Sequence, residues 1–413
     1  MSARQERWSL PAEHRQALAA GLIALVVFGA SWTLLHWGFY THDQIIDTPV
    51  YQRYGDAMLE GQVPYADFRV EYPPAALPVF LLPAIGDRHD ADTYRRNFER
   101  LMVVCGLLAI AGAALALGAL NAAPERLFAA LAFASLAPLA LGSVILSRFD
   151  LWPTALLVLG LAAVLAGRRR IGLGVLGLAA AAKIFPAVVV PPVLIYVWRR
   201  YGRREAIAAA IVFVLVVVAC FVPFLSASPA GVWDSLSRQA DRPLQIESLG
   251  SSFLLVAHQL GAWTVHLNLS HGSQNQGGSF AGFLAAVQSL LQAAAVVGLW
   301  IAFGRGRSTP ERLVRYSAAS VAAFIALGKV LSPQFLVWLL PLVPLVRGRR
   351  GLAAAALLAL ALVLTQLWFP YRYWRLALQQ DAIASWLVLA RDLVLVALAV
   401  VLAMPRREPA RSA

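Results

Sequence analysis

Acidic side chains concentrate in one polar stretch of this basic chain, residues 41–74 (THDQIIDTPVYQRYGDAMLEGQVPYADFRVEYPP). The stretch holds six carboxylates and two arginines, while the whole chain has a net charge of +13. A carboxylate beside an apolar segment can be partly desolvated, which raises its pKa and lets it accept a proton as a general base. Asp43 and Asp47 are the leading pair for this chemistry. The alternative is a solvated loop with ordinary acids.

The conformation of the segment that carries this pair is open. The four-residue spacing of Asp43 and Asp47 places both on one face if the segment is helical. Pro49 and the two isoleucines before it make an extended turn as plausible as a helix. The choice of which carboxylate is the base is open as well.

Aromatic side chains and rigid turns follow these acids, in GQVPYADF (61–68) and EYPP (71–74). Tyr65, Phe68 and Tyr72 offer flat apolar faces that can stack on a sugar ring. The same residue types form the aromatic belt of membrane proteins at the water interface. The two interpretations have equal weight.

Lysine is almost absent, because only Lys183 and Lys329 among the 35 cationic residues are lysines. Each lies near a proline between two short apolar segments, where an ammonium group is costly unless it has an anionic partner. A phosphate is one candidate partner, and a carboxylate such as Asp150 or Glu247 is the other. Arginines expected on the same face, which can bind phosphate through two hydrogen bonds, are Arg148, Arg242, Arg372 and Arg375.

Signals for a metal or a cofactor are weak. His258, His266 and His271 occur in one region, but they match no spacing of a known metal site. The chain has neither a phosphate-binding P-loop nor a dinucleotide fingerprint. We expect no cofactor, no metal requirement and no nucleotide-sugar site of the soluble type.

Composition identifies the class of protein that must position these residues. Hydrophobic residues make up 60% of the 413 residues and charged residues 14%, whereas soluble proteins are about one-quarter charged. Short arginine clusters lie between apolar segments, as in cytoplasmic loops, which argues against a nucleic-acid partner. Both cysteines lie in apolar runs, so no disulfide framework is expected. The first apolar run lacks a clear cleavage site and predicts a retained signal anchor.

Hydropathy predicts an all-α integral membrane protein, a polytopic bundle of about 12 transmembrane helices. The expected spans are 17–38, 97–119, 127–145, 151–167, a hairpin within 171–198 that turns at 183–185, 205–225, 280–303, a second hairpin of 316–331 and 334–346, 351–369 and 383–404. We treat residues 1–413 as one polytopic domain. Its first extracytoplasmic loop, 39–96, carries the acids and a short apolar piece, 75–86, expected to lie at the interface. The second large loop is 226–279.

The distribution of charge predicts the orientation of this bundle. The expected inner segments contain 21 cations and six acids, whereas the rest of the chain contains 14 cations and 16 acids. Lys and Arg concentrate in cytoplasmic loops. We therefore expect a plasma-membrane protein with both termini in the cytoplasm and the acidic loop outside.

Six short motifs follow one another along most of the chain: DTPVY (47–51), GQVPY (61–65), EYPP (71–74), KIFP (183–186), LQIES (244–248) and SPQ (332–334). Their order and their expected placement on one face resemble the GT-C superfamily of integral membrane glycosyltransferases. The most similar family is that of the polyprenol-phosphate-mannose-dependent α-1,2-mannosyltransferases of the actinobacterial cell envelope. The resemblance implies an inverting transfer of a sugar, usually mannose, from a polyprenyl-phosphate donor at an extracytoplasmic active site.

The resemblance also implies that Asp47 is the base that activates the acceptor hydroxyl, with Asp43 as an additional acid nearby. We expect the phosphate of the donor to be bound by Lys183, Lys329, Arg148, Arg242 and Arg372. We expect the sugar or the acceptor, a cell-envelope glycolipid or glycan, to be contacted by Tyr51, Tyr65, Glu71, Tyr72, Gln245, Glu247 and Gln334.

Two other functions compete with this one. Broken helices and intramembrane charges are also typical of transporters, so a lipid-linked sugar flippase or transporter is the alternative. The chain shows no inverted repeat, and its polar residues concentrate at one expected face instead of the membrane midplane. A non-catalytic assembly factor is the third possibility.

Overall fold

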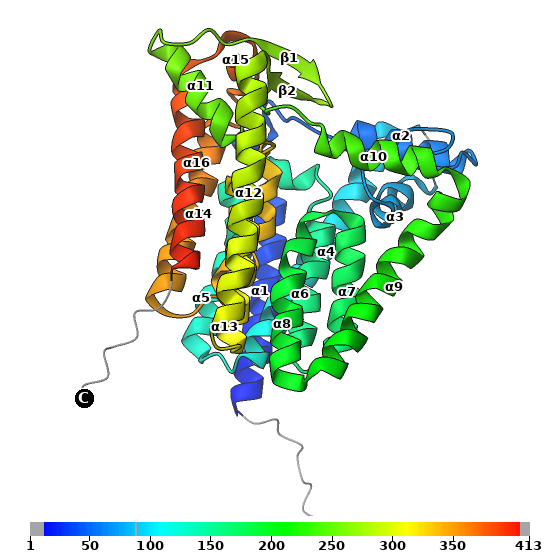
Figure 1. The fold of residues 1–413 in the computed structure, drawn as a ribbon, viewed down its shortest axis with the longest axis vertical. Helices are drawn as coiled ribbons and strands as arrows, with labels where there is room; N and C mark the ends of the chain where they lie inside the picture. The colour runs from blue at the N-terminus through cyan, green and yellow to red at the C-terminus, as the bar shows by residue number, and fades with distance from the viewer. Residues whose placement is uncertain (1–11, 87–88, 405–413) are drawn as a thin grey trace, which may run out of the picture.

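Helices make up most of the described chain, which is residues 12–86 and 89–404 of a computed structural model. The longest helices form a bundle (Figure 1): α1 (Ala12–Leu34), α4 (Ala91–Ala119), α5 (Pro124–Leu141), α9 (Arg203–Ala227), α12 (Ser279–Arg305), α14 (Gly348–Trp368) and α16 (Ala382–Ala403). Within the described residues, six of these, all but α1, are long and apolar enough to cross a membrane. The protein is therefore a mostly helical, multi-pass membrane protein.

Shorter helices complete the bundle. They are α6 (Leu151–Leu165), α7 (Arg169–Ala182), α8 (Val190–Tyr201) and α13 (Pro310–Ala326), with the 3-10 turns η4 (Ser143–Leu146), η5 (Phe185–Val189), η6 (Pro333–Leu339) and η7 (Val343–Leu345). The chain leaves α7 at Lys183, whose backbone is extended, just before Pro186. Pro186 cannot continue α7, because its ring would clash with the preceding helical turn. The helix therefore ends where the sequence predicted a turn, at 183–185.

One end of the bundle carries small elements from the two predicted outer loops (Figure 1). The first loop contains η1 (Gly38–Thr41), α2 (Thr48–Leu59), η2 (Pro74–Ala76), α3 (Leu77–Leu81) and η3 (Leu82–Ala84). The second contains α10 (Pro229–Ala240), α11 (Leu249–Gln259), β1 (Leu267–Ser270) and β2 (Ser273–Gln276), and α15 (Tyr373–Gln379) lies at the same end.

The strands β1 and β2 form an antiparallel hairpin, in which Leu267 pairs with Gln276 and Ser270 with Ser273. His271 and Gly272 form its two-residue turn with positive φ angles of 51° and 66°, as the favoured hairpin turns require. This hairpin corrects the all-α prediction. Val265, Leu267 and Leu269 alternate with polar residues before and within β1, a strand pattern that the prediction overlooked, whereas β2 is polar throughout.

Local signals fix where the long helices begin. The side chain of Asp90 caps α4, that of Thr309 caps α13 and that of Asp381 caps α16, each by accepting a hydrogen bond from a backbone N–H of the first turn. Proline stands in the first turn of α5 and α10, where its missing N–H costs nothing.

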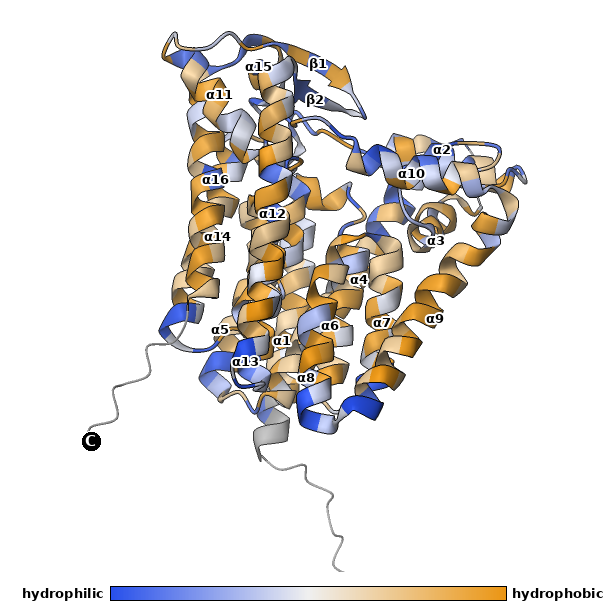
Figure 2. Cartoon of the chain, in the orientation of Figure 1, coloured by the Kyte–Doolittle hydropathy of each residue, from blue (hydrophilic) through white to orange (hydrophobic). Residues whose placement is uncertain are grey.

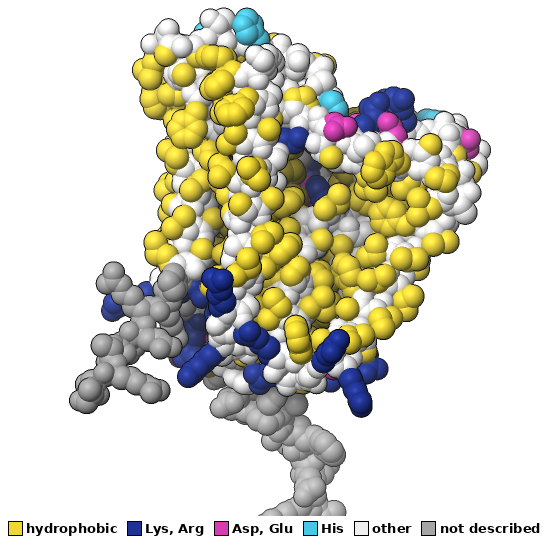
Figure 3. All heavy atoms as spheres, viewed as in Figure 1, with side chains coloured by type: hydrophobic (Ala, Val, Ile, Leu, Met, Phe, Trp, Pro, Cys, Tyr) yellow, Lys and Arg dark blue, Asp and Glu magenta, His cyan; other side chains and the backbone are white. Residues whose placement is uncertain are grey.

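Charge separates the two ends of the bundle. Hydrophobic residues cover its sides (Figure 2), and most of the Lys and Arg side chains in view gather at the end opposite the β-hairpin. Asp, Glu and His side chains appear at the hairpin end, together with a smaller group of Lys and Arg side chains near α10 (Figure 3). The separation agrees with the predicted charge asymmetry. The chain termini, which were predicted to be cytoplasmic, lie outside the described residues.

Two predicted helices differ from the structure. Residues 334–346 form the 3-10 turns η6 and η7 instead of one α-helix, because Pro333, Pro341 and Pro344 interrupt the run. The apolar piece at 75–86 is broken into η2, α3 and η3; it packs against α2 and α4 while Leu82 and Ile85 are exposed. Leu18–Leu34 and Leu151–Leu165 are apolar but shorter than the six candidate spans, so the count of about 12 stays a prediction.

Glycines bring α6 and α7 together, and these two helices carry Asp150 and Lys183 at their cavity-facing ends. A Cβ on Gly172 would lie 2.5 Å from Val164 Cγ2 and 2.7 Å from the carbonyl oxygen of Gly160. No real Cβ approaches backbone so closely, so the helices can touch here only without a side chain.

Gly172→Ala should therefore lower the midpoint temperature of unfolding in detergent. The added methyl group overpacks the contact and lowers the free energy of unfolding by about 1–3 kcal/mol. Gly298→Ala in α12 is the matched control, because its Cβ would meet nothing within 4 Å. Thermal unfolding monitored by circular dichroism compares the two. Equal midpoints for both variants would contradict this account of the α6–α7 contact.

Candidate active site

A cavity of about 760 Å³ opens between the bundle and the small elements at the hairpin end. Figure 3 shows a hollow between α12 and α10 in which Lys and Arg side chains are visible. The polar and charged side chains that line the cavity are Asp47, Arg53, Tyr54, Glu71, Tyr72, Arg148, Lys183, Gln239, Arg242, Gln245, Glu247, His271, Ser273, Ser289, Gln292, Lys329, Ser332, Gln334, Trp338 and Tyr373.

Most of the residues predicted from sequence meet in this cavity, although they come from distant parts of the chain. Those that line it are Asp47, Glu71, Tyr72, Arg148, Lys183, Arg242, Gln245, Glu247, Lys329 and Gln334. Those that do not are Asp43, Tyr51, Tyr65 and Arg372. Their roles in binding or catalysis remain predictions.

Asp47 and Asp43 have different surroundings. The segment between them is extended, and Asp47 stands at the N-terminus of α2. Its Oδ2 forms an ion pair with Arg148 Nη1 and accepts a hydrogen bond from the Tyr51 hydroxyl at 3.4 Å. Asp43 is exposed and has a positive φ of 52°. The extended alternative therefore holds, and only Asp47 faces the cavity.

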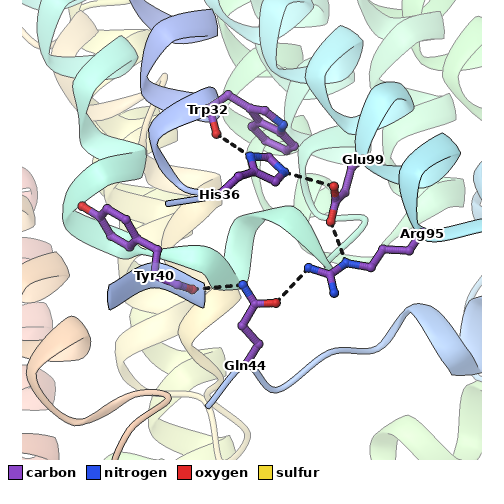
Figure 4. Close-up of polar contacts among 6 residues, drawn as sticks. All are labelled: Trp32, His36, Tyr40, Gln44, Arg95 and Glu99. Atoms are coloured by element: carbon purple, nitrogen blue, oxygen red, sulfur yellow. Dashed lines mark hydrogen bonds and ion pairs between the residues drawn. The ribbon is translucent and has the colours of Figure 1, made fainter. Parts of the chain in front are cut away.

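A polar network ties the segment before Asp47 to the bundle (Figure 4). Gln44 Nε2 donates to the carbonyl of Tyr40 at 3.0 Å, and Arg95 Nη2 donates to Gln44 Oε1 at 2.9 Å. Arg95 Nε also pairs with Glu99, which contacts His36 Nε2 at 3.1 Å. The network joins the end of α1 and the start of α4 to the chain three residues before Asp47, and so limits where that carboxylate can lie.

Lys183 has a carboxylate partner. Its Nζ lies 2.7 Å from Asp150 Oδ1, and the Trp338 indole donates to the same oxygen at 2.6 Å. The ring of Trp338 stacks on Phe185 with centroids 3.8 Å apart, and the Lys183 ammonium lies 4.7 Å from the Phe149 ring centroid. Of the two partners that the sequence left open, the structure shows the carboxylate.

Three cations of the cavity have no acidic partner within ion-pair distance in the described chain. Lys329 Nζ donates to the carbonyl of Ala240 at 2.7 Å, and Arg242 Nη2 donates to Ser273 Oγ at 3.0 Å. Arg53 is the third and is exposed. By contrast, Arg372 lies 3.5 Å from Asp381 outside the cavity lining. Lys329, Arg242 and Arg53 are therefore the lining cations that form no ion pair among the described residues, while the carboxylates of Glu71 and Glu247 line the same cavity.

The segment 244–248 forms another wall of the cavity. Its backbone pairs with β2 through Ile246 N to Gln274 O, at 3.0 Å, and Gln276 N to Leu244 O, at 2.8 Å. Gln245 Nε2 donates to Glu247 Oε2 at 2.8 Å and to Ser332 Oγ at 2.9 Å. The β-hairpin thus holds this segment across the top of the cavity.

Glu247 is a buried carboxyl group on the cavity wall. Its Oε1 is buried and has no hydrogen-bond partner among the described residues. Burial raises the pKa of Glu247 to about 7, and the Arg391 and Arg148 guanidinium groups act in the opposite direction. A carboxyl group that changes charge near neutral pH can accept hydrogen bonds or a proton from a substrate hydroxyl.

The predicted sugar-stacking tyrosines separate into two groups. Tyr51 is buried in an aromatic cluster and stacks on Phe80 with ring centroids 4.6 Å apart. Tyr65 is buried too, and its hydroxyl donates to the carbonyl of Tyr72 at 2.6 Å. Tyr72 itself lines the cavity. Tyr51 and Tyr65 therefore support the walls from behind.

Sequence reasoning missed Arg53, Tyr54, His271, Trp338 and Tyr373 as cavity residues. Arg53 and Tyr54 follow Asp47 by six and seven residues, about two turns of α2, so their spacing from it was a usable signal. Trp338 lies in an apolar run and Tyr373 beside other aromatics, where no local pattern marks them. In the part of the chain that the structure describes, no three His, Cys, Asp or Glu side chains form a group that could hold a metal ion.

Comparison with known proteins gives a family match. The model described as Glycosyltransferase family 87 matches residues 71–333, more than half of the chain. The match includes Arg148, Lys183, Arg242, Glu247 and Lys329 but begins after Asp47. No curated protein matches the chain.

Two solved structures have a similar arrangement of helices. The first is ArnT from Cupriavidus metallidurans bound to undecaprenyl phosphate, with 16% identity, a TM-score of 0.49, and 94% of this chain and 76% of that chain covered. The second is the oligosaccharyltransferase of Archaeoglobus fulgidus in the apo form, with 13% identity, a TM-score of 0.46, and coverage of 98% and 57%.

Asp150→Asn should destabilise the fold strongly, because it leaves the Lys183 ammonium in a buried site without its counter-charge, at a cost of about 3–5 kcal/mol. Asp234→Asn is the control, since Asp234 pairs with Arg238 at the surface, 3.1 Å away, where such pairs contribute at most about 1 kcal/mol. Denaturant unfolding in detergent measures both. The double variant Asp150→Asn/Lys183→Met should recover part of the loss, and failure to do so would contradict the pairing.

Proposed function

The chain belongs to glycosyltransferase family 87, a family of GT-C-type membrane glycosyltransferases, and on that premise we propose that it transfers a sugar from a polyprenyl-phosphate donor to a cell-envelope glycolipid or glycan. The observation that carries the proposal is the cavity at the hairpin end, which combines uncompensated cations with carboxylates. The sugar that we propose is mannose, as the resemblance implies.

Cations without an ion pair support a phosphate site at Lys329 and Arg242. A cation that already has a carboxylate partner would have to exchange it for a phosphate oxygen, whereas Lys329 and Arg242 can bind phosphate without losing an ion pair. Arg53 supplements them from α2. Lys183 and Arg148, which hold Asp150 and Asp47, contribute to the positive field around the phosphate. As the bond to the sugar breaks, these cations stabilise the negative charge that develops on the leaving phosphate.

A lipid donor fits the position of the cavity. It lies at the end of apolar helices, and its hollow between α12 and α10 adjoins the hydrophobic sides of the bundle (Figure 3). A polyprenyl chain can therefore stay against apolar surface while its headgroup reaches the cations. We propose that this end faces outside the cell, because Lys and Arg gather at the opposite end.

Asp47 is the proposed general base. Its contacts with Arg148 and Tyr51 both fall on Oδ2, so Oδ1 is available to an acceptor hydroxyl. In one step the acceptor oxygen forms a bond to the anomeric carbon from the face opposite the phosphate, and its proton passes to Asp47. The bond between the anomeric carbon and the phosphate oxygen breaks, and its electron pair stays on the phosphate. This single displacement inverts the anomeric centre.

The sugar and the acceptor are proposed to contact four other residues that line the cavity: Gln245, Glu247, Tyr72 and Gln334.

Asp47→Asn should lower sugar transfer per folded molecule by at least about 10²-fold, the contribution of a positioned base, and it should also lower stability, because it removes the partner of the buried Arg148. Asp43→Asn is the matched control, because Asp43 lies four residues away, is exposed and does not line the cavity. The assay follows radiolabelled polyprenyl-phosphate mannose in nanodiscs into a new glycan. Full activity of Asp47→Asn would remove Asp47 from the mechanism, and movement of the unchanged labelled lipid between leaflets would favour a flippase instead.

Lys329→Gln and Arg242→Gln should each raise the KM for the lipid donor by about tenfold, since a hydrogen bond to a charged group contributes about 1.5 kcal/mol or more. Arg238→Gln is the control, because Arg238 lies on α10 near the cavity but pairs with Asp234. Initial rates at varied donor concentration give the KM of each variant. Unchanged KM values in both cavity variants would exclude these two cations as the phosphate site.

A further inference from the structure

Helix α16 contains a buried ion pair, although it is long and apolar enough to span a membrane. Arg391 and Asp392 are both 0% exposed, and Arg391 Nε lies 2.7 Å from Asp392 Oδ1. The Arg391 guanidinium carbon lies 5.7 Å from the centroid of the Trp368 ring. Charged groups within membrane spans are costly and usually serve a function, yet neither residue lines the cavity.

Arg391 reaches the cavity wall through the main chain of Glu247. Its Nη2 donates to the Glu247 carbonyl oxygen at 2.8 Å, across 144 positions of sequence. The helix α11, which follows Glu247 directly, also packs against α16 (Figure 1). The other contacts of this segment come from the β-hairpin, from Ser332 and from the carbonyl of Lys329, which accepts a hydrogen bond from Gln245 N at 2.9 Å. Arg391 is the contact from α16 that acts on the main chain of Glu247 itself.

We propose that Arg391 is a positioning residue that fixes the main chain at Glu247 so that its carboxylate faces the cavity. The charges of Arg391 and its partner Asp392 then act on that carboxylate from α16. The proposal rests on the proposed function in so far as the cavity is the active site. In its ionised form Glu247 accepts hydrogen bonds from the hydroxyls of the sugar or the acceptor.

Several charged or titratable side chains act on Glu247: Arg148 before α6, Arg242 on its own segment, Tyr373 from α15, and Arg391 and Asp392 from α16. Burial is the main reason that the pKa of Glu247 lies near 7. Arg391 lowers this pKa, whereas the neighbouring Asp392 raises it. The two members of one ion pair therefore have opposite effects on Glu247.

Because Arg391 and Asp392 have opposite effects on the pKa of Glu247, removing each of them in turn tests the proposal. If the ion pair had only a structural role, this pKa would not shift in opposite directions. Arg391→Gln removes a cation, so the pKa of Glu247 should rise, by about one unit or more. Asp392→Asn removes an anion, so the same pKa should fall. The direct measurement is a pH titration of the infrared band of the protonated Glu247 carboxyl group, identified by its absence in Glu247→Gln. This titration needs no sugar transfer, so it decides the proposal even if the proposed function fails.

The pH profile of transfer supplies the second readout. Because the ionised carboxylate is the accepting form, transfer should rise with pH through about 7 in the natural protein. The midpoint should move up in Arg391→Gln and down in Asp392→Asn, and it should stay in place in Arg391→Lys, which keeps the charge. Arg315→Gln is the matched control, because Arg315 also donates to carbonyl groups at the end of α16, those of Leu402 and Met404, but lies far from Glu247 in the bundle.

A variant without either charge keeps the proposal testable if the single variants fail to fold. Arg391→Met/Asp392→Leu preserves volume, and apolar replacement of a buried ion pair is often tolerated. It should fold and lose about 10- to 100-fold in kcat through misplacement of Glu247, with little change in the donor KM. Titration midpoints that do not shift in opposite directions, or natural kcat in the folded double variant, would overturn the proposal.

Discussion

The balance of charge inside the cavity is the constraint on which the rest of the structure depends. Ammonium and guanidinium groups in a partly desolvated hollow must be matched by anions, and here Asp47 and Asp150 match Arg148 and Lys183. Lys329 and Arg242 have only a backbone carbonyl and a serine hydroxyl as partners. Glu71 and Glu247 line the same cavity, and the phosphodiester of the proposed donor would add one further negative charge beside these two cations. The charge on the phosphate increases when the sugar leaves, which is when the cations stabilise it most.

The scaffold serves this arrangement of charges. Close glycine contacts between α6 and α7 hold the ends that carry Asp150 and Lys183 side by side. Pro186 ends helix α7 beside Lys183, because its ring cannot follow another helical turn. The Gln44–Arg95–Glu99–His36 network fixes the extended segment that leads to Asp47. The β-hairpin and Arg391 hold Glu247 from opposite sides. Four charged side chains at the cavity, those of Asp47, Asp150, Lys183 and Glu247, are therefore each held by contacts that can be named.

Several features of this site could be predicted from sequence, because a polar residue in an apolar chain is conspicuous. The rarity of lysine identified Lys183 and Lys329, the prolines located the breaks beside them, and the acidic stretch identified Asp47. Other features depend on tertiary contacts that no local pattern encodes. The choice of Asp150 as the partner of Lys183, the hydrogen bond from Trp338 and the exclusion of Asp43 and Arg372 from the cavity became visible only in three dimensions. Tyr51 and Tyr65 show the same limit, since they pack behind the cavity wall and their predicted contact with the sugar or the acceptor stays a prediction.

The most direct test of the central claim is an electron cryomicroscopy structure of the protein in nanodiscs with a polyprenyl-phosphate mannose bound. The account predicts the phosphate within hydrogen-bond distance of Lys329 and Arg242, the lipid chain leaving between α12 and α10, and the anomeric carbon directed toward Asp47. A phosphate bound at the arginine-rich end of the bundle, or a headgroup that avoids both Lys329 and Arg242, would contradict it.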